Sequence, residues 1–245
     1  MVQWLRSLVF VVQMYLAMAV LGIVFLPWAL VSRRGARSAC LNFCRWVRWT
    51  ARWMVGLRTE VRGTPPTGEV LIAAKHQSFL DIILIFGAVP AGKFIMKREL
   101  MFAPVIGQYA LRIGCVPVDR GKRGQAIRKM SLDVARGAAD PGQLIIYAQG
   151  TRVAPGFKAP YKVGTAALYQ QMGALGQPCV PVGTNVGLFW PRRGILRKPG
   201  TAVVEFLPVI PPGLDKKTFL KRLEAEVEAS SDALMAEAGF VSPTR

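Results

Sequence analysis

The residues of this chain that could carry out acid-base chemistry are His76 and Asp81, five positions apart. His76 is the only histidine, so an imidazole can transfer a proton at this position alone. The spacing places a carboxylate about one helical turn beyond the imidazole, near enough to accept a hydrogen bond from one ring nitrogen. The other ring nitrogen is then free to act as a base at neutral pH. We therefore predict a histidine base that is oriented by a carboxylate.

The same stretch also has a purely structural interpretation. Ser78-Phe79-Leu80-Asp81 matches the start of a helix, in which Ser78 is the N-cap and an acidic residue three positions later reaches back to its amide. Asp81 would then belong to a helix cap, and His76 would be an ordinary loop residue. The two interpretations are compatible, because a cap can hold the carboxylate that orients the imidazole.

The formal net charge of +18 predicts an anionic partner. Residues 1–59 contain eight arginines and no acidic residue. Nucleic acid and anionic lipid are the usual partners of such a surface. The apolar N-terminus favours an anionic phospholipid membrane, and we expect no nucleic-acid partner.

The four cysteines show no metal-ligand spacing with the single histidine. We interpret them as reduced thiols of a protein that faces the cytosol. No disulfide and no metal site is expected.

The N-terminal region predicts a pair of membrane-anchoring helices. Leu8 to Val31 is a run of 24 residues without a charge, long enough to cross a bilayer core of about 30 Å. One arginine precedes this run, and three follow it between residues 33 and 37. This bias places the remainder of the chain in the cytoplasm.

Residues 38–58 predict a second helix that lies in the membrane interface. An arginine face and a tryptophan stripe lie side by side at helical spacing, and this combination suits the headgroup layer. The alternative is that the tryptophans pack on the core of the domain. The residues concerned are Arg45, Arg48 and Arg52, and Trp46, Trp49 and Trp53.

From residue 69 onward, short apolar runs alternate with helical stretches. This alternation predicts an α/β fold with a mixed, largely parallel sheet flanked by helices. The expected strands are 70–74, 93–96, 115–118, 144–148, 179–184 and 201–207. The expected helices are 79–87, 104–113, 124–137, 164–172 and 216–237.

Polar clusters follow the predicted strands. In parallel sheets ligands gather outside the carboxyl ends of the strands, so one cavity could hold His76 together with several cations. Each basic residue alone is more often solvated surface. The clusters contain Lys97, Asp119-Arg120 and Gln149-Gly150-Thr151-Arg152, and Val180-Pro181-Val182 begins a further element.

The order of four blocks, His-x4-Asp, Gly-x4-Asp-Arg, Gly-Thr-Arg and Val-Pro-Val, resembles the glycerolipid acyltransferase superfamily. Within it, residues 60–210 resemble the bacterial 1-acyl-sn-glycerol-3-phosphate acyltransferases, and the N-terminal helix pair is similar to their membrane anchor. Two of the blocks differ from the family pattern, the first at Lys75 and the third at Tyr147-Ala148-Gln149, where the family usually has Phe-Pro-Glu. Lys75 precedes the histidine where the family usually has Asn, and Gln149 stands where the third block usually has Glu.

The resemblance implies transfer of a fatty acyl group from acyl-carrier protein or coenzyme A to the free hydroxyl of lysophosphatidic acid, with no cofactor and no metal. It implies that His76 is the general base and that Asp81 orients it. The implied substrate-binding residues are Lys97, Asp119, Arg120, Gln149, Gly150, Thr151, Arg152, Val180 and Pro181.

The same resemblance implies two functional regions. Residues 1–58 would be the membrane anchor, and residues 59–245 would be the catalytic domain. The anchor would hold the enzyme on the bacterial inner (cytoplasmic) membrane, with the catalytic domain facing the cytoplasm.

Two alternatives remain open. The chain could acylate another lysolipid, such as lyso-ornithine lipid, with Gln149 reflecting the different headgroup. It could also be a non-catalytic membrane protein that binds anionic lipid through its basic surface. A hydrolase or a nucleotide-binding protein is disfavoured, because the sequence has no Gly-x-Ser-x-Gly elbow, no Walker loop and no Gly-x-Gly-x-x-Gly.

Overall fold

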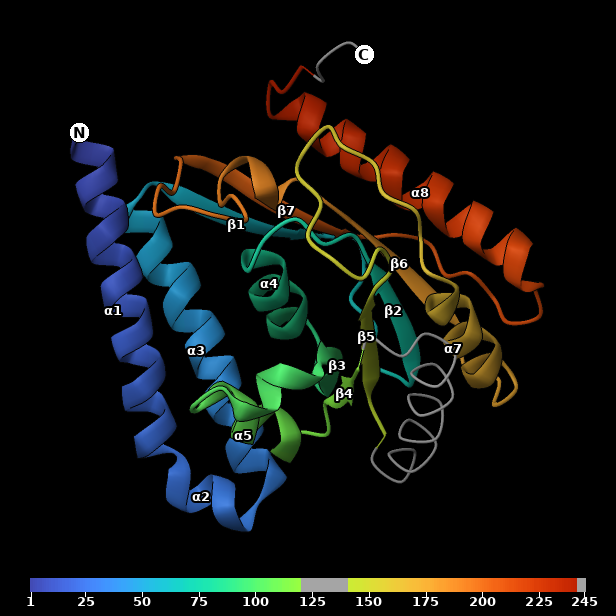
Figure 1. The fold of residues 1–245 in the computed structure, drawn as a ribbon, viewed down its shortest axis with the longest axis horizontal. Coiled ribbons are helices and arrows are strands. Elements are labelled where there is room, and N and C mark those ends of the chain that lie inside the picture. Colours follow the sequence, from blue (N-terminus) through green and yellow to red (C-terminus); the bar gives the residue numbers. More distant parts are fainter. Residues whose placement is uncertain (120–140, 242–245) are drawn as a thin grey trace.

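A single sheet forms the centre of the molecule, with helices on both of its faces (Figure 1). The computed structural model describes residues 1–119 and 141–241. Within these residues the sheet has seven strands in the order β1-β7-β6-β2-β5-β3-β4. The strands are β1 (Leu57–Arg62), β2 (Val70–Ala74), β3 (Gly92–Lys97), β4 (Val116–Val118), β5 (Gln143–Tyr147), β6 (Cys179–Thr184) and β7 (Gly200–Phe206).

Neighbouring strands run parallel except for β6 and β7, which are antiparallel. The predicted mixed, largely parallel sheet is therefore confirmed. Strands β2 and β6 have the predicted bounds, and the other four predicted strands differ by one residue at one or both ends. The edge strand β1 was not predicted, because charged residues occupy every second position and it is not an apolar run like the strands inside the sheet. It lies at the edge of the described sheet, where it pairs with β7.

The helices divide between the two faces because alternate residues of a strand point in opposite directions. Ile72 and Ala74 of β2 lie in a core with α4 (Leu80–Ala88) and α5 (Ile106–Arg112). Leu71 and Ala73 lie in a second core with α7 (Val163–Gly173) and α8 (Lys216–Glu237). The expected helix over 124–137 falls on residues outside the described ranges.

The apolar run at the N-terminus does not form one helix, which corrects the expectation of a single segment from Leu8 to Val31. Helix α1 (Val2–Val24) ends before Phe25, and a short helix α2 (Leu26–Val31) follows. Pro27 stands in the first turn of α2, where its missing N–H and fixed φ are tolerated, and it could not continue α1. By length and composition α1 could cross a membrane.

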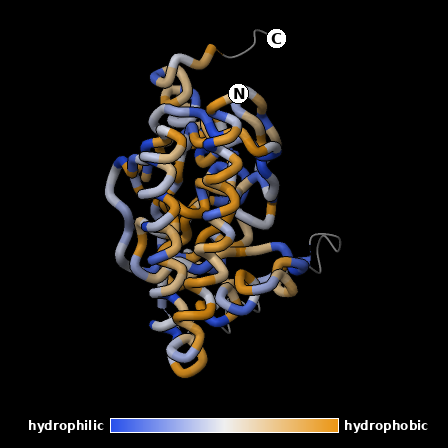
Figure 2. The backbone as a smooth tube through the Cα atoms, turned by 90° about the vertical axis from the view of Figure 1, so that its left-hand side faces the viewer, coloured by the Kyte–Doolittle hydropathy of each residue, from blue (hydrophilic) through white to orange (hydrophobic). Residues whose placement is uncertain are grey.

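Helix α3 (Arg33–Met54) begins five residues earlier than the expected interfacial helix, because the Ser32 hydroxyl caps it by accepting a hydrogen bond from the Arg34 amide at 3.2 Å. Its three tryptophans are between 41% and 56% exposed, so they do not fill the core. The exposed face of α1 is also apolar, and Figure 2 shows hydrophobic residues along it. Both helices thus present apolar side chains outward.

The opposite face of α1 is built into the domain. Phe10 has no exposed surface, and its ring lies edge-on to Trp190 with a centroid distance of 5.5 Å. The Gln3 side chain donates hydrogen bonds to the carbonyls of Val55 and Arg197 at 3.0 and 2.7 Å. At the other end of α1, the Tyr109 hydroxyl donates to the Gly22 carbonyl at 2.6 Å. Residues 1–58 therefore share one apolar core with the sheet.

We expect Phe10→Ala to lower the free energy of unfolding by about 3–5 kcal/mol, because it empties a fully buried aromatic site. The matched control is Val9→Ala on the same helix, where the side chain is 49% exposed. Thermal unfolding of the purified protein in detergent measures both effects. Equal effects of the two substitutions would show that α1 does not pack on the domain as described.

Candidate active site

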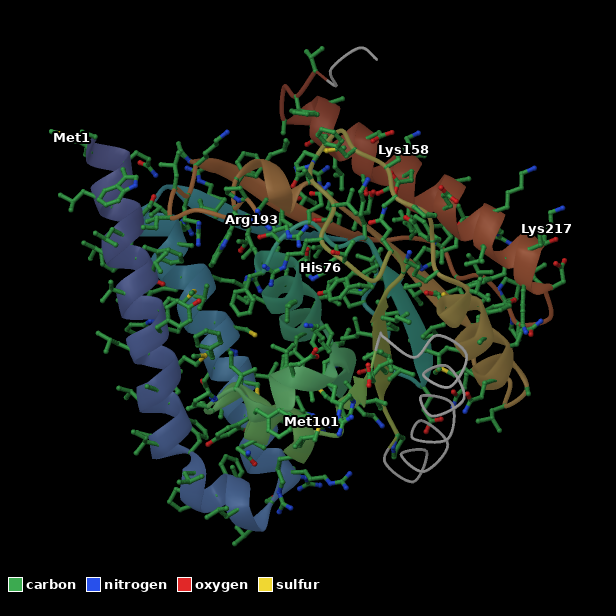
Figure 3. All side chains as sticks on the ribbon, in the orientation of Figure 1. Met1, His76, Met101, Lys158, Arg193 and Lys217 are labelled. Atoms are coloured by element: carbon green, nitrogen blue, oxygen red, sulfur yellow. The ribbon has the colours of Figure 1, made fainter. Side chains whose placement is uncertain are left out.

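The candidate site lies where β2 ends and α4 begins, near the middle of the molecule (Figure 3). After Ala74 the chain passes over the carboxyl edge of the sheet and enters α4 at Leu80. Nδ1 of His76 and Oδ1 of Asp81 are 2.8 Å apart. The predicted contact between the imidazole and the carboxylate is therefore present in the structure.

The second oxygen of Asp81 binds the backbone. Oδ2 accepts hydrogen bonds from the amides of Gln77 and Ser78, both at 2.8 Å. The Ser78 hydroxyl accepts from the Leu80 amide at 3.1 Å. The helix begins at Leu80 with Phe79 as its N-cap, so Ser78 is not the N-cap that the pattern predicted. Asp81 still reaches back to the Ser78 amide and also binds the imidazole, so parts of both interpretations hold.

This arrangement selects one tautomer of His76. A carboxylate can only accept, so Nδ1 carries the proton in the neutral ring and Nε2 keeps its lone pair. Among the described residues, Nε2 has no hydrogen-bond partner, and the side chain is 12% exposed. The geometry provides a base that is open to an incoming hydroxyl.

Tyr147 forms one wall of the site. Its ring stacks on the imidazole with a centroid distance of 3.8 Å and an interplanar angle of 14°. Burial raises the pKa of Tyr147 well above its usual value, and the negative charge of Asp81 raises it further. The phenol therefore stays protonated at physiological pH, and its ring covers one face of the imidazole.

The turn after β5 lies next to the histidine loop. Gly150 has a φ of 70°, a left-handed conformation that favours glycine. The Val153 amide donates to the His76 carbonyl at 2.8 Å, which joins the two loops. Thr151 is exposed and Arg152 is partly buried, so both can meet a ligand at this edge.

Two other predicted residues follow strands farther along the same edge. Lys97 ends β3 and pairs with Glu99 at 3.0 Å, and Asp119 follows β4 and lies 3.9 Å from Arg98. Strand β5 separates β3 from β2, so Lys97 is roughly 10 Å from the histidine strand in the sheet direction. Arg120 lies outside the described residues.

Val180 and Pro181 have a different position from the other predicted site residues. They lie inside the sheet, in register with Ile72 and Ala73 of β2, and both are buried. Their position supports the strand that leads to His76 and does not face the open edge.

Glu228 of α8 was missed in the sequence and lies directly behind the site. One carboxylate oxygen is 2.6 Å from Nζ of Lys75, and the other accepts from the Tyr161 hydroxyl at 3.0 Å and from Gln149 Nε2 at 3.3 Å. The unusual pair Lys75 and Gln149 was the available signal. Their partner could not be found, because Glu228 is one of several acidic residues in α8 and its burial depends on the fold.

An apolar cavity of about 160 Å³ opens beside α4. Phe79, three residues after His76, is part of its wall. Burial raises the pKa of the three lining thiols, to about 12 for Cys40, to about 11 for Cys115 and above its usual value for Cys44, so they remain uncharged. Other lining residues come from α1, α3 and α4: Met18, Leu21, Phe43, Ile82, Ile83 and Phe86.

Known proteins resemble this chain over most of its length. The acyltransferase family model matches residues 58–185. The 1-acyl-sn-glycerol-3-phosphate acyltransferase of Pseudomonas aeruginosa is 27% identical over 240 residues, covering 96% of this chain and 91% of that protein. The 1-acyl-sn-glycerol-3-phosphate acyltransferase alpha of Mus musculus is 28% identical over 78% of this chain and 67% of its own length.

The fold is also similar to a solved structure. The crystal structure of the 1-acyl-sn-glycerophosphate acyltransferase from Thermotoga maritima superposes with a TM-score of 0.77. The sequence identity is 22%, and the match covers 96% of this chain and 98% of the other.

We expect Asp81→Asn to move the proton of the neutral His76 ring from Nδ1 to Nε2. The asparagine oxygen would stay bound to the amides of Gln77 and Ser78, so its NH₂ group would turn toward Nδ1. Because His76 is the only histidine, ¹⁵N NMR of the labelled protein reports this ring alone. Asp119→Asn is the control and should leave the spectrum unchanged; identical spectra for Asp81→Asn and the parent would contradict the assigned tautomer.

Proposed function

This chain belongs to the acyltransferase family, and we propose that it transfers a fatty acyl group from a thioester to the free hydroxyl of 1-acyl-glycerol 3-phosphate, giving phosphatidic acid. The thioester carrier would be acyl-carrier protein or coenzyme A. The relatives from Pseudomonas aeruginosa and Mus musculus, both 1-acyl-sn-glycerol-3-phosphate acyltransferases, support this substrate. The observation that carries the proposal is the imidazole of His76, bound to Asp81 through Nδ1 with Nε2 unpartnered among the described residues.

In the proposed reaction, Nε2 of His76 takes the proton of the glycerol hydroxyl as its oxygen attacks the thioester carbonyl carbon. Asp81 stabilises the imidazolium that forms. The carbon–sulfur bond then breaks, and the departing thiolate receives the proton from the imidazolium. No covalent enzyme intermediate is required, because a thioester already has a good leaving group.

The developing oxyanion needs hydrogen-bond donors. The amides of Gln77 and Ser78 are closest in sequence to the base, but both already donate to Asp81. We therefore infer that the oxyanion is stabilised by other donors at this edge.

The phosphate of the acceptor would bind the cations beside the histidine loop. Arg152 is the first candidate, because its loop is hydrogen-bonded to the His76 loop and a guanidinium matches a phosphate with two parallel donors. Thr151 would add a hydroxyl, and Lys97 a charge farther along the edge. The resemblance assigns Asp119 and Arg120 to the same acceptor region.

Gln149, Gly150, Val180 and Pro181 would shape the site without holding the ligand. Gln149 is buried and turned toward Glu228, and Gly150 makes the turn that presents the next two residues. Val180 and Pro181 support β2 from the neighbouring strand. We therefore propose supporting roles for these four residues.

The acyl chain of the donor would occupy the apolar cavity beside α4. The exposed apolar face of α1 and the tryptophans of α3 would enter the membrane, while the arginines of α3 would meet anionic headgroups. The excess of arginine after the first apolar run supports a catalytic domain on the cytoplasmic side of a bacterial inner membrane.

Both alternatives lose support at specific residues. Gln149 faces Glu228, so its difference from the family pattern does not indicate a different lysolipid headgroup. A non-catalytic protein would have no use for the complete set of contacts around His76 and Asp81. Phosphatidic acid synthesis is therefore the function that we favour.

An activity assay of the purified protein in nanodiscs tests this function. Each donor, an acyl-carrier protein thioester or a coenzyme A thioester, is combined with each acceptor, lysophosphatidic acid or lyso-ornithine lipid. We expect acylation of lysophosphatidic acid to be fastest. Preference for the amino-acid lipid would overturn the assignment of the acceptor, and no transfer from either donor would overturn the function.

We expect His76→Ala to lower kcat by at least about 10²-fold, the lower end of a general-base contribution. Binding to vesicles that contain anionic phospholipid should be unchanged, because the helices that contact the membrane are unaltered. Steady-state rates and vesicle sedimentation measure the two properties. A variant as active as the parent would refute the role of His76.

We expect Ile82→Trp to shift the preference toward shorter acyl chains, because the larger ring fills part of the apolar cavity. The kcat/KM for the longest donors should fall by about tenfold or more, in line with the effect of one or two methylenes on a hydrophobic pocket. Assays with donors of increasing chain length measure this change. Ile82→Leu is the matched control, and an equal loss for all chain lengths would place the acyl chain elsewhere.

A further inference from the structure

We propose that Glu228, in the C-terminal helix α8, is a positioning residue for the acyl transfer reaction: its single carboxylate holds the His76 loop and the Thr151-Arg152 loop in alignment. The proposal rests on the function given above and adds a helix that is distant in sequence to the site. Glu228 touches no reacting atom. It acts through the residues that precede the two loops.

The first contact is a buried ion pair. Nζ of Lys75 lies 2.6 Å from Glu228 Oε2, and the two side chains are 1% and 8% exposed. Lys75 directly precedes His76, so its ammonium fixes the end of β2 to α8. Removal of one partner from such a pair leaves a buried charge, which is strongly unfavourable.

The second set of contacts reaches the other loop from both ends. Glu228 Oε1 accepts from Gln149 Nε2 at 3.3 Å and from the Tyr161 hydroxyl at 3.0 Å. Gln149 and Tyr161 flank the segment that contains Thr151 and Arg152. One carboxylate therefore binds the histidine side of the site and both ends of the facing loop.

The remaining contacts make α8 part of the same unit. On the other side of His76, the side-chain nitrogen Nε2 of Gln77 lies 3.7 Å from Sδ of Met235. The Gln77 side-chain oxygen accepts from the Gly187 amide at 3.0 Å. Both neighbours of the catalytic histidine are thus held, one by Glu228 and one by a residue two turns farther along α8.

Alignment of the two loops matters because the base and the phosphate-binding residues must meet one acceptor molecule. A displacement of about 1 Å between such groups can reduce the rate by about 10²-fold. The apolar cavity is lined by α1, α3, α4 and α5, on the other face of the sheet from α8. A loss of Glu228 should therefore affect kcat and leave the KM for the acyl donor nearly unchanged.

The test uses the full-length protein in detergent and three variants. Glu228→Gln removes the charge with little change in volume. Glu226→Gln is the matched control on the same helix, where the carboxylate side chain is 31% exposed and pairs with Arg222 at 2.7 Å. The exchange Gln149→Glu/Glu228→Gln keeps the net charge and moves the carboxylate to the other side of the same hydrogen bond.

We expect Glu228→Gln to lower kcat by about tenfold or more and to change the donor KM by less than about threefold. Hydrogen-deuterium exchange of residues 149–162 should become faster. Glu226→Gln should match the parent in every measurement. The double variant Gln149→Glu/Glu228→Gln should return kcat to within about threefold of the parent, which a general loss of stability would not permit.

Parental kcat in a folded Glu228→Gln variant would overturn the proposal, and so would an exchange variant that folds but stays as slow as Glu228→Gln. If Glu228→Gln does not fold, the double variant Gln149→Glu/Glu228→Gln decides: a kcat more than about threefold below the parent, or failure to fold, would overturn the proposal. If the parent does not acylate lysophosphatidic acid, the proposed function fails, while deuterium exchange still shows whether Glu228 holds the 149–162 loop.

Discussion

The carboxylate of Asp81 is held by three donors, and the geometry of the site depends on this arrangement. Two backbone amides bind one oxygen and the imidazole of His76 binds the other. The amides belong to the same short loop as the histidine, so the position of the ring is set over a distance of a few residues. Burial of the carboxylate removes competing water, which strengthens each of these hydrogen bonds. A base with a defined free nitrogen results.

The parallel sheet extends this local arrangement to the rest of the site. Strands β2 and β5 are neighbours, so the loops that follow them leave the same edge and can bond to each other. Gln149 stands where the four-block pattern that the sequence resembles has Glu, and the structure has a carboxylate of α8 next to it. The charge that is missing from the loop is thus present in space, on a helix about 80 positions later in the chain.

Much of this fold and site could be predicted from local sequence, and the exceptions share a cause. Strand β2 is an apolar run that ends at polar residues, and His76 and Asp81 are close in sequence, so their contact follows from spacing. Strand β1 carries alternating charges because it lies at an edge, a position that no local pattern reveals. Glu228 looks like any acidic residue of a surface helix, because its burial arises only when α8 packs against the sheet. Contacts between residues that are close in sequence can be predicted from their spacing, whereas contacts across the sheet are seen only in the folded structure.

The contacts of α1 with residues far along the chain have a consequence for the order in which the protein folds during synthesis. This helix leaves the ribosome before the sheet, yet the carbonyl of Arg197, which the Gln3 side chain binds, lies 194 positions later. If α1 enters the bilayer as proposed, the Phe10 ring and one of the two hydrogen bonds of Gln3 gain their partners Trp190 and Arg197 only after residue 197 has been translated. Completion of the domain then draws one side of the helix out of lipid and into protein. Biogenesis would therefore end at the membrane surface, with the catalytic part already tethered to the bilayer that holds its substrates.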